Sequence, residues 1–159
     1  MLAVGDLVPA FDLHASTGEV VSPAALRGTR WVIFFYPKDD TPGCTIETRE
    51  FGRAHADFAA AGIRVFGCSI GDIAAKRAFA AACEADDLPL LADPDHRVAE
   101  DFGSWGERPV AGGSVLGVAR TTFLIGADGR VAAVWPTVTP LGHAQQVLDV
   151  ARGSQSSTA

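Results

Sequence analysis

One stretch decides how this chain folds: WVIFFYPKDDTPGCTIE, residues 31–47. Its first part, Trp31–Tyr36, is a continuous apolar run of strand length, which predicts a β-strand buried on both faces. Pro37 ends that strand, because proline has no N–H to donate to a central ladder. A polar segment, residues 38–40, then leads to a second proline. The first half of the stretch therefore predicts a buried strand followed by a loop.

The second half of the stretch predicts the start of a helix. Thr41 is a favoured N-cap residue, and Pro42 fits the first helical position, where its missing N–H costs nothing. Cys44 would then be the third helical residue, among unpaired backbone N–H groups at the positive end of the helix dipole, and both favour a thiolate. Most free cysteines are small buried hydrophobes. The polar segment before Cys44 and its place in the first turn favour a reactive thiol instead.

The rest of the chain predicts strands that alternate with helices. The helix that begins at Thr41 should end at Ala61, because Gly62 follows it as a C′ residue would. Glu47 lies largely off the inward stripe of this helix. The stripe has helical spacing and consists of Phe51, Ala54, Phe58 and Ala61.

Downstream patterns complete a mixed α/β sheet with helices on both faces. Further strands are expected over residues 63–70, 88–92, 119–125 and 131–135, and further helices over 72–85, 95–102 and 141–151. Residues 103–118 are rich in glycine and predict an irregular loop. We expect a single domain over residues 1–152 and a small polar, disordered tail over 153–159.

The opening stretch also resembles a known family. Residues 35–47, FYPKDDTPGCTIE, are similar to the active-site segment of the peroxiredoxins, and most of all to the bacterioferritin comigratory protein, or Q-type, group of thiol peroxidases. The general pattern Pro-x-x-x-Thr-x-x-Cys is met by Pro37, Thr41 and Cys44. The resemblance covers residues 5–150 and implies a thioredoxin-like fold, which agrees with the α/β alternation.

The resemblance implies a role for each site residue. Cys44 would be the peroxidatic nucleophile, whose thiolate attacks the weak O–O bond. The Thr41 hydroxyl would orient the peroxide as well as cap the helix, and Pro37 would shield the thiolate from water. Arg120 matches the arginine of a late strand that points at the cysteine and stabilises negative charge. Glu47 matches a supporting glutamate that helps to hold this arginine, although on its own it could simply be solvated.

The chain departs from the family at the resolving thiol. Many Q-type members carry a second cysteine in the same helix, at the position where Arg49 stands. Cys83 is the remaining candidate, because some members carry this thiol on the following helix; its alternative role is to fill the core beside Phe79. A disulfide with Cys83 would require local unfolding. Cys68, within a buried strand, is expected to be inert, and an external thiol acting directly in a one-cysteine mechanism stays open.

Composition argues against several other classes of protein. Thirteen basic against nineteen acidic residues give a net charge of −6, which disfavours nucleic acid or an anionic membrane as partner. No segment approaches the ~20 apolar residues of a membrane span. Residues 1–6 lack the features of a signal peptide, so we expect a cytoplasmic protein. The cysteines and the four scattered histidines have no metal-ligand spacing, so no metal or other cofactor is expected.

These patterns together predict a thiol peroxidase that reduces hydrogen peroxide and organic hydroperoxides through a cysteine sulfenic acid. A thioredoxin or similar thiol reductant would regenerate the thiol. A monomer or weak homodimer is expected, because no large exposed apolar stripe is evident. A protein disulfide oxidoreductase is the rival enzyme, but the chain has no Cys-x-x-Cys pair. A non-catalytic holdase or binding module is the rival without activity, and the complete set of motif residues argues against it.

Overall fold

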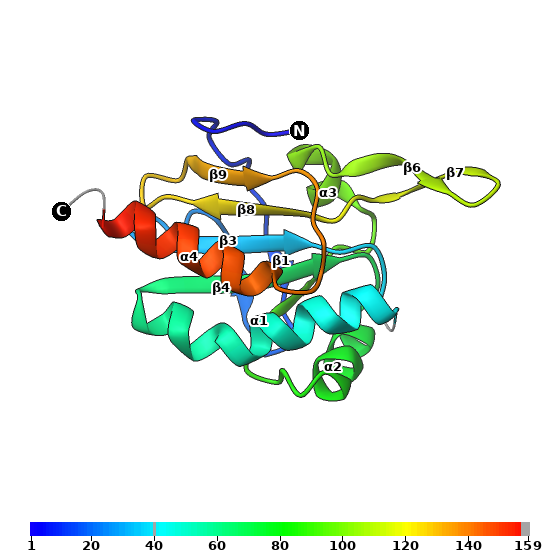
Figure 1. Ribbon diagram of the computed structural model, residues 1–159, viewed down its shortest axis with the longest axis horizontal. Coiled ribbons are helices and arrows are strands. Elements are labelled where there is room, and N and C mark those ends of the chain that lie inside the picture. The colour runs from blue at the N-terminus through cyan, green and yellow to red at the C-terminus, as the bar shows by residue number, and fades with distance from the viewer. Residues whose placement is uncertain (40, 157–159) are drawn as a thin grey trace.

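A mixed five-stranded sheet forms the centre of the computed structural model, which describes residues 1–39 and 41–156. Its strands are β3 (Arg30–Phe35), β4 (Ile63–Ser69), β5 (Leu90–Ala92), β8 (Thr121–Ile125) and β9 (Val131–Trp135). They lie in the order β5-β4-β3-β8-β9, and Figure 1 shows β4, β3, β8 and β9 side by side. β3 pairs in parallel with β4, and β4 with β5, whereas β8 is antiparallel to both β3 and β9. The predicted α/β class is confirmed.

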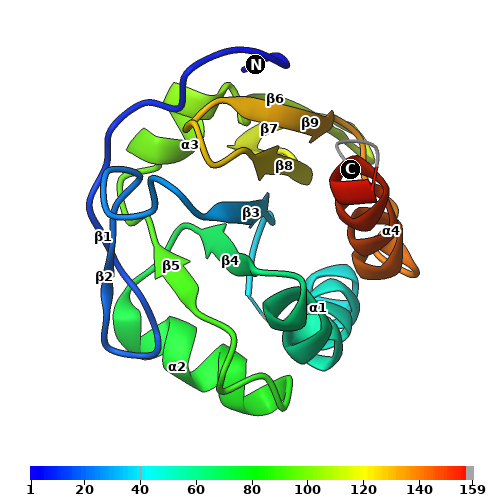
Figure 2. The same ribbon diagram turned by 90° about the vertical axis from the view of Figure 1, so that its left-hand side faces the viewer.

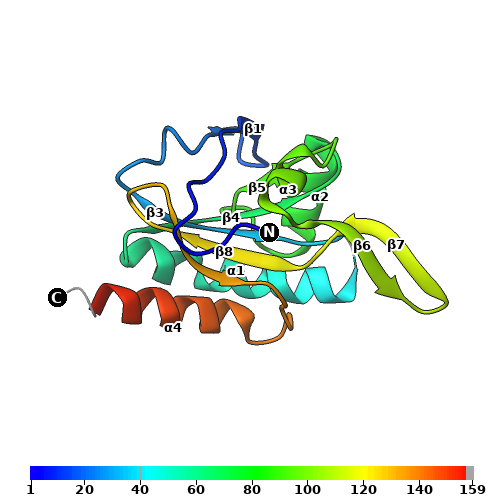
Figure 3. The same ribbon diagram turned by 90° about the horizontal axis from the view of Figure 1, so that it is seen from above.

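Helices and the N-terminal segment cover both faces of this sheet. The helices are α1 (Pro42–Ala60), α2 (Ile73–Ala82), α3 (Arg97–Phe102) and α4 (His143–Ser156). Figures 2 and 3 show α1 and α4 side by side on one face, with α3 on the other beside the short strands β1 (Leu13–His14) and β2 (Val20–Val21). No helix among the described residues is long and apolar enough to cross a membrane.

The central strand β3 is buried on both faces, as its apolar run predicts. Every side chain from Trp31 to Tyr36 is at most 1% exposed. Phe34 packs into the core formed with α1, α2 and α4, whereas Ile33 and Phe35 pack into the core formed with α3. Successive residues of a strand point to opposite faces. β3 therefore links the two cores and fixes the place where the chain leaves the sheet for α1.

Helix α1 begins and ends where its sequence predicts. Thr41 is the N-cap residue with an extended backbone, and Pro42 is the first helical residue. Gly62 follows the helix with a φ of 77°, a left-handed conformation that glycine adopts without strain. Phe51 and Phe58 are fully buried on the inward face, and the Phe51 ring stacks on Phe34 with centroids 4.3 Å apart. This packing holds α1 against β3.

Two segments differ from the predictions. The predicted loop over residues 103–118 contains a β-hairpin of β6 (Trp105–Val110) and β7 (Gly113–Val118), which extends away from the sheet in Figure 1. The predicted tail is helical as far as Ser156, so the domain boundary expected at residue 152 falls inside α4. Helix propagation past a packed segment adds one hydrogen bond for each residue fixed, which accounts for this extension. The last part of the predicted tail, residues 157–159, lies outside the described residues.

Candidate active site

Strand register brings Arg120 to the first turn of α1. β3 ends at Phe35, which pairs with Thr121 at the start of β8. Because the two strands are antiparallel, the residue before β8 reaches the carboxyl end of β3, where the chain turns into α1. The Arg120 side chain therefore reaches Cys44 across a separation of 76 residues.

Arg120 joins two residues on one face of α1. Its Nη1 donates to Glu47 Oε1 at 2.8 Å, and its Nη2 donates to Cys44 Sγ at 3.4 Å. Cys44 and Glu47 are three residues apart, so they are neighbours on the helix surface. Both are fully buried, while the Arg120 side chain keeps 16% of its exposure. Three of the predicted residues thus meet in one buried cluster.

The position of Glu47 corrects two expectations. It is neither solvated nor off the inward stripe, because it extends that stripe by one turn toward Cys44. Burial raises the pKa of Glu47 to about 7, although the charge of Arg120 and its hydrogen bond oppose this shift. The second carboxyl oxygen, Oε2, is buried and has no hydrogen-bond partner among the described residues. The carboxyl group therefore favours its protonated form more than an exposed glutamate does.

Arg120 provides a lasting positive charge beside the sulfur. Burial alone would lower the pKa of its guanidinium. The charges of Glu47 and Cys44 and their hydrogen bonds outweigh that effect, so the pKa is raised above its ordinary value. A group that already titrates far above neutrality is thereby kept protonated.

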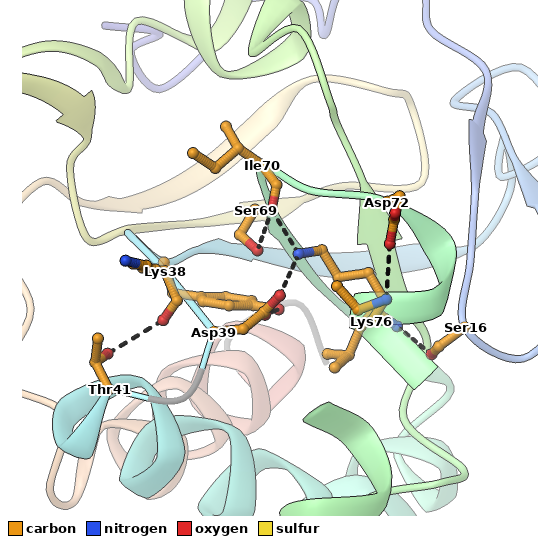
Figure 4. Close-up of polar contacts among 11 residues, drawn as sticks. Ser16, Lys38, Asp39, Thr41, Ser69, Ile70, Asp72 and Lys76 are labelled. Carbon is orange, nitrogen blue, oxygen red and sulfur yellow. Dashed lines mark hydrogen bonds and ion pairs between the residues drawn. The ribbon is translucent and has the colours of Figure 1, made fainter. Parts of the chain in front are cut away.

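Thr41 occupies the predicted N-cap position, but its hydroxyl does not cap the helix. The hydroxyl donates instead to the carbonyl of Lys38 at 3.1 Å (Figure 4). Threonine side chains often bond nearby backbone in this way, and here the carbonyl three residues earlier competes with the helix N–H groups. The Thr41 carbonyl accepts from Thr45 N at 2.9 Å, which closes the first turn. Pro37 is half-buried in the same connecting segment.

The two other cysteines lie on opposite faces of the sheet. Cys68, in β4, packs into the core with α3, and burial raises the pKa of its thiol well above the usual value. Cys83 follows α2, is 2% exposed and packs into the same core as Cys44. None of the three cysteines forms a disulfide. Only Cys83 therefore shares a core with Cys44.

The end of α2 that carries Cys83 packs against the middle of α1. Arg49 Nη2 donates to the carbonyl of Ala82 at 3.3 Å. Gly52 lies so close to the turn after α2 that a Cβ built on it would be 2.8 Å from Ala85 Cβ. The chain on either side of Cys83, at Ala82 and Ala85, thus lies beside the second and third turns of α1, beyond the turn that holds Cys44.

Sequence reasoning missed a buried histidine near this cluster. His143 Nδ1 donates to Gln146 Oε1 at 3.0 Å, and its Nε2 accepts from the Thr122 hydroxyl at 2.7 Å. Burial first, and also the charge of Arg120, lower the pKa of His143 and favour the neutral ring. An isolated histidine in a closing helix gives no sequence signal for this place. Among the described residues, no group of three or more His, Cys, Asp or Glu is arranged to hold a metal ion.

Gly43 leaves the space that Arg120 occupies, which gives a testable prediction. A Cβ at residue 43 would lie 3.0 Å from Arg120 Nη2, the atom that donates to Cys44 Sγ. Gly43→Ala should therefore displace Nη2 by a few tenths of an ångström and slow the reaction with peroxide roughly threefold to tenfold, less than the ~10²-fold loss that a 1 Å misplacement can cause. Stopped-flow measurement of the rate constant checks this. The matched control is Gly153→Ala in α4, where a Cβ has no neighbour within 4 Å; equal rates in both variants would contradict the prediction.

Comparisons with known proteins agree with the fold and give the family of the chain. A model of the AhpC/TSA family matches residues 4–134. The chain is 38% identical over 149 residues to a putative peroxiredoxin Bcp of Coxiella burnetii, which covers 92% of this chain and 97% of the relative. It is 36% identical over 148 residues to peroxiredoxin Bcp of Escherichia coli, with 93% and 94% covered.

Solved structures show the same likeness. PrxQ of Xylella fastidiosa superposes with a TM-score of 0.90 at 28% identity and covers 98% of both chains. The bacterioferritin comigratory protein of Xanthomonas campestris, whose structures concern alkyl peroxide reduction, superposes with a TM-score of 0.84 at 33% identity and covers 91% of both chains. The chain belongs to the AhpC/TSA family and is a peroxiredoxin of the bacterioferritin comigratory protein, or Q-type, group: a thiol peroxidase with a thioredoxin-like fold.

Proposed function

We propose that Cys44 is the sulfur that attacks the peroxide and that Arg120 is its electrostatic partner. The hydrogen bond from Arg120 Nη2 to Cys44 Sγ is the observation that carries this proposal. Sγ also lies in the first turn of α1, where unpaired N–H groups and the helix dipole favour an anion. A cation and a helix N-terminus thus act on the same sulfur in a buried place, where electrostatic interactions are stronger than in water.

The chemical step follows from these charges. The Cys44 thiolate attacks one peroxide oxygen, the S–O bond forms and the O–O bond breaks, which oxidises the sulfur to a sulfenic acid. The departing oxygen takes the electron pair, and Arg120 stabilises its growing negative charge. That oxygen then takes up a proton and leaves as water or alcohol. Because Cys44 is fully buried and Arg120 is 16% exposed, the peroxide would enter from the Arg120 side.

Three neighbours would support this step. Glu47 holds the guanidinium by its 2.8 Å hydrogen bond and so fixes the direction of Nη2. The Thr41 hydroxyl, while it donates to the Lys38 carbonyl, would accept a hydrogen bond from the peroxide and so orient the substrate. Pro37, half-buried in the same segment, would keep water from the sulfur. These roles follow the family pattern, and the shared location of the residues at the start of α1 supports them.

We propose Cys83 as the resolving thiol, with an external thiol as the alternative. The place of Cys83 in the same core as Cys44 favours it over Cys68. The sulfenic acid and the Cys83 thiol would condense to a disulfide and water, after local unfolding brings the sulfurs together. A thioredoxin-like protein would then reduce the disulfide. Hydrogen peroxide and organic hydroperoxides are the proposed substrates, and a cytoplasmic monomer or weak homodimer is the proposed form.

Mass analysis of the reduced protein after one equivalent of hydrogen peroxide tests these assignments. A chain lighter by two hydrogens, with Cys44 and Cys83 in one linked peptide pair, is expected if Cys83 resolves. A chain heavier by one oxygen on Cys44 is expected if the resolving thiol is external. Peroxide consumption measured on the same samples links the modification to turnover.

Two variants control this experiment. Cys83→Ser should retain the oxygen on Cys44, because no internal thiol remains on that face to condense with it. Cys44→Ser should take up no oxygen and consume no peroxide. Oxidation of Cys68 in place of Cys44, or peroxide consumption unchanged in Cys44→Ser, would overturn the assignment of the nucleophile.

A further inference from the structure

A fully buried lysine lies between α2 and the segment that follows β3, and the mechanism above does not use it. Lys76 has no exposed surface. Its Nζ donates to Asp39 Oδ2 at 2.8 Å and to the carbonyl of Ile70 at 2.6 Å (Figure 4). The ammonium group also lies 5.7 Å from the centre of the Tyr36 ring. Buried charges are rare in proteins unless they are paired, so the place of Lys76 depends on these partners.

The carboxylate of Asp39 is held on both oxygens. Lys76 bonds Oδ2, and the Tyr36 hydroxyl donates to Oδ1 at 2.9 Å. Burial and the charge of Asp39 raise the pKa of Tyr36, which keeps the hydroxyl a donor. Removal of one partner of a buried ion pair leaves the other charge uncompensated. The pair therefore fixes Asp39 to α2 and to the end of β3.

Asp39 in turn belongs to the segment that sets the first turn of α1. Its neighbour Lys38 accepts the hydrogen bond from the Thr41 hydroxyl (Figure 4). The Thr41 carbonyl accepts from the Thr45 amide in the turn that holds Cys44. A displacement of Asp39 would move the neighbouring Lys38 carbonyl, and with it the Thr41 hydroxyl that is bonded to that carbonyl.

We propose that Lys76 is a positioning residue for the peroxidase reaction: through Asp39 it holds the Cys44 turn in the form that reacts with peroxide, and this ion pair must open before Cys83 can reach Cys44. The proposal rests on the role of Cys44 proposed above. Helix α2 carries Lys76 and is followed directly by Cys83. The same helix therefore carries the lysine that stabilises the peroxide-reactive form and is followed by the thiol that reacts with the oxidised Cys44.

The ion pair places opposite demands on two steps of one cycle. Attack on peroxide requires an intact first turn of α1, because that turn aims its N–H groups and Arg120 at Sγ. Formation of the disulfide requires that this turn or the end of α2 unwinds, because both sulfurs are buried and the chain on either side of Cys83 lies beside later turns of α1. A weaker ion pair should slow the first step and speed the second. A purely structural role for Lys76 would not give these opposite changes.

Lys76→Met tests the proposal, since methionine is unbranched, only one atom shorter than lysine, and uncharged. In the reduced variant, hydrogen exchange of the Thr45 amide, measured by NMR, should rise about tenfold or more, a factor that corresponds to about 1.4 kcal/mol. The rate constant for reaction with hydrogen peroxide should fall, and the rate constant for disulfide formation should rise. Asp39→Asn, which breaks the pair from its other side, should change the three quantities in the same directions.

Asp72→Ala is the matched control. The Asp72 side chain caps α2 by accepting from Ala75 N at 2.8 Å, whereas Lys76 Nζ donates to Asp39 and to the carbonyl of Ile70. Its loss should raise exchange at Ala75 and leave the Thr45 amide and the peroxide step unchanged. If Lys76→Met matches the wild type in Thr45 exchange and in both rate constants, the proposal is wrong. If Cys44 of the wild type does not react with peroxide, the proposed function is wrong instead. If the wild type forms no internal disulfide, Thr45 exchange and the rate of the peroxide step still test the role of Lys76.

Discussion

Arg120→Met is expected to slow the reaction of Cys44 with hydrogen peroxide by about 10²–10³-fold, the range found when one donor to a developing negative charge is removed. Arg120 Nη2 is the hydrogen-bond donor seen at Cys44 Sγ, and its charge lies in a buried cluster. Its loss should remove a donor to the sulfur and leave the negative charge on the departing oxygen without this stabilisation. Stopped-flow measurement of the second-order rate constant, with folding checked by circular dichroism, gives the result.

Two further variants separate charge from geometry. Arg120→Lys keeps the positive charge, but a single ammonium cannot reproduce the fork that reaches Glu47 and Cys44 at once, so an intermediate rate is expected. Arg53→Met removes an exposed arginine from the same helix as Cys44 and should react like the wild type. A rate constant for Arg120→Met equal to that of Arg53→Met would show that the guanidinium has no part in the step.

The sequence predicts the elements that are buried in the core, because burial leaves a pattern of apolar residues. It does not predict the hairpin, whose residues show no such pattern. The apolar run of β3 and the turn of Thr41 and Pro42 are local signals, and the structure confirms both. Among the described residues, β6 and β7 pair only with each other and extend from the sheet, and the side chains of β7 do not alternate between buried and exposed. Val115 and Leu116 are both exposed although they are apolar neighbours. The glycines of residues 103–118 therefore predict a loop in place of the hairpin.

The site could be predicted only in part, because residues far apart in the sequence are brought together by the register of paired strands, which no local pattern shows. The resemblance identified Arg120, and its meeting with Cys44 depends on the pairing of Phe35 with Thr121. Two buried charged residues do carry a local signal in the sequence, because each lies on the inward face of its helix. Glu47 is four residues before Phe51, and Lys76 is three before Phe79. A charge at such a position must be paired when the helix packs.

The folded chain is expected to lose stability as the pH rises toward neutrality, because Glu47 in the folded chain holds its proton more tightly than it does in the unfolded chain. Burial raises the pKa of Glu47 from an ordinary 4.5 to about 7, so between these values the folded chain holds a proton that the unfolded chain has released. Stability falls with pH wherever the folded state binds more protons, and each pKa unit corresponds to about 1.4 kcal/mol. The free energy of unfolding should thus lose about 3 kcal/mol across this window through Glu47 alone.

Glu47→Gln isolates this effect, because glutamine still accepts from Arg120 but does not titrate. Denaturant unfolding at several pH values gives the difference in unfolding free energy between the wild type and the variant. Asp93 and His143 also have shifted pKa values, but they titrate in both proteins and cancel in the difference. The wild type should therefore fall relative to the variant from pH 4.5 to 7, whereas an ordinary exposed glutamate would give parallel curves. Parallel curves would mean that Glu47 is already ionised at the lower end of this window, with its charge fully balanced by Arg120.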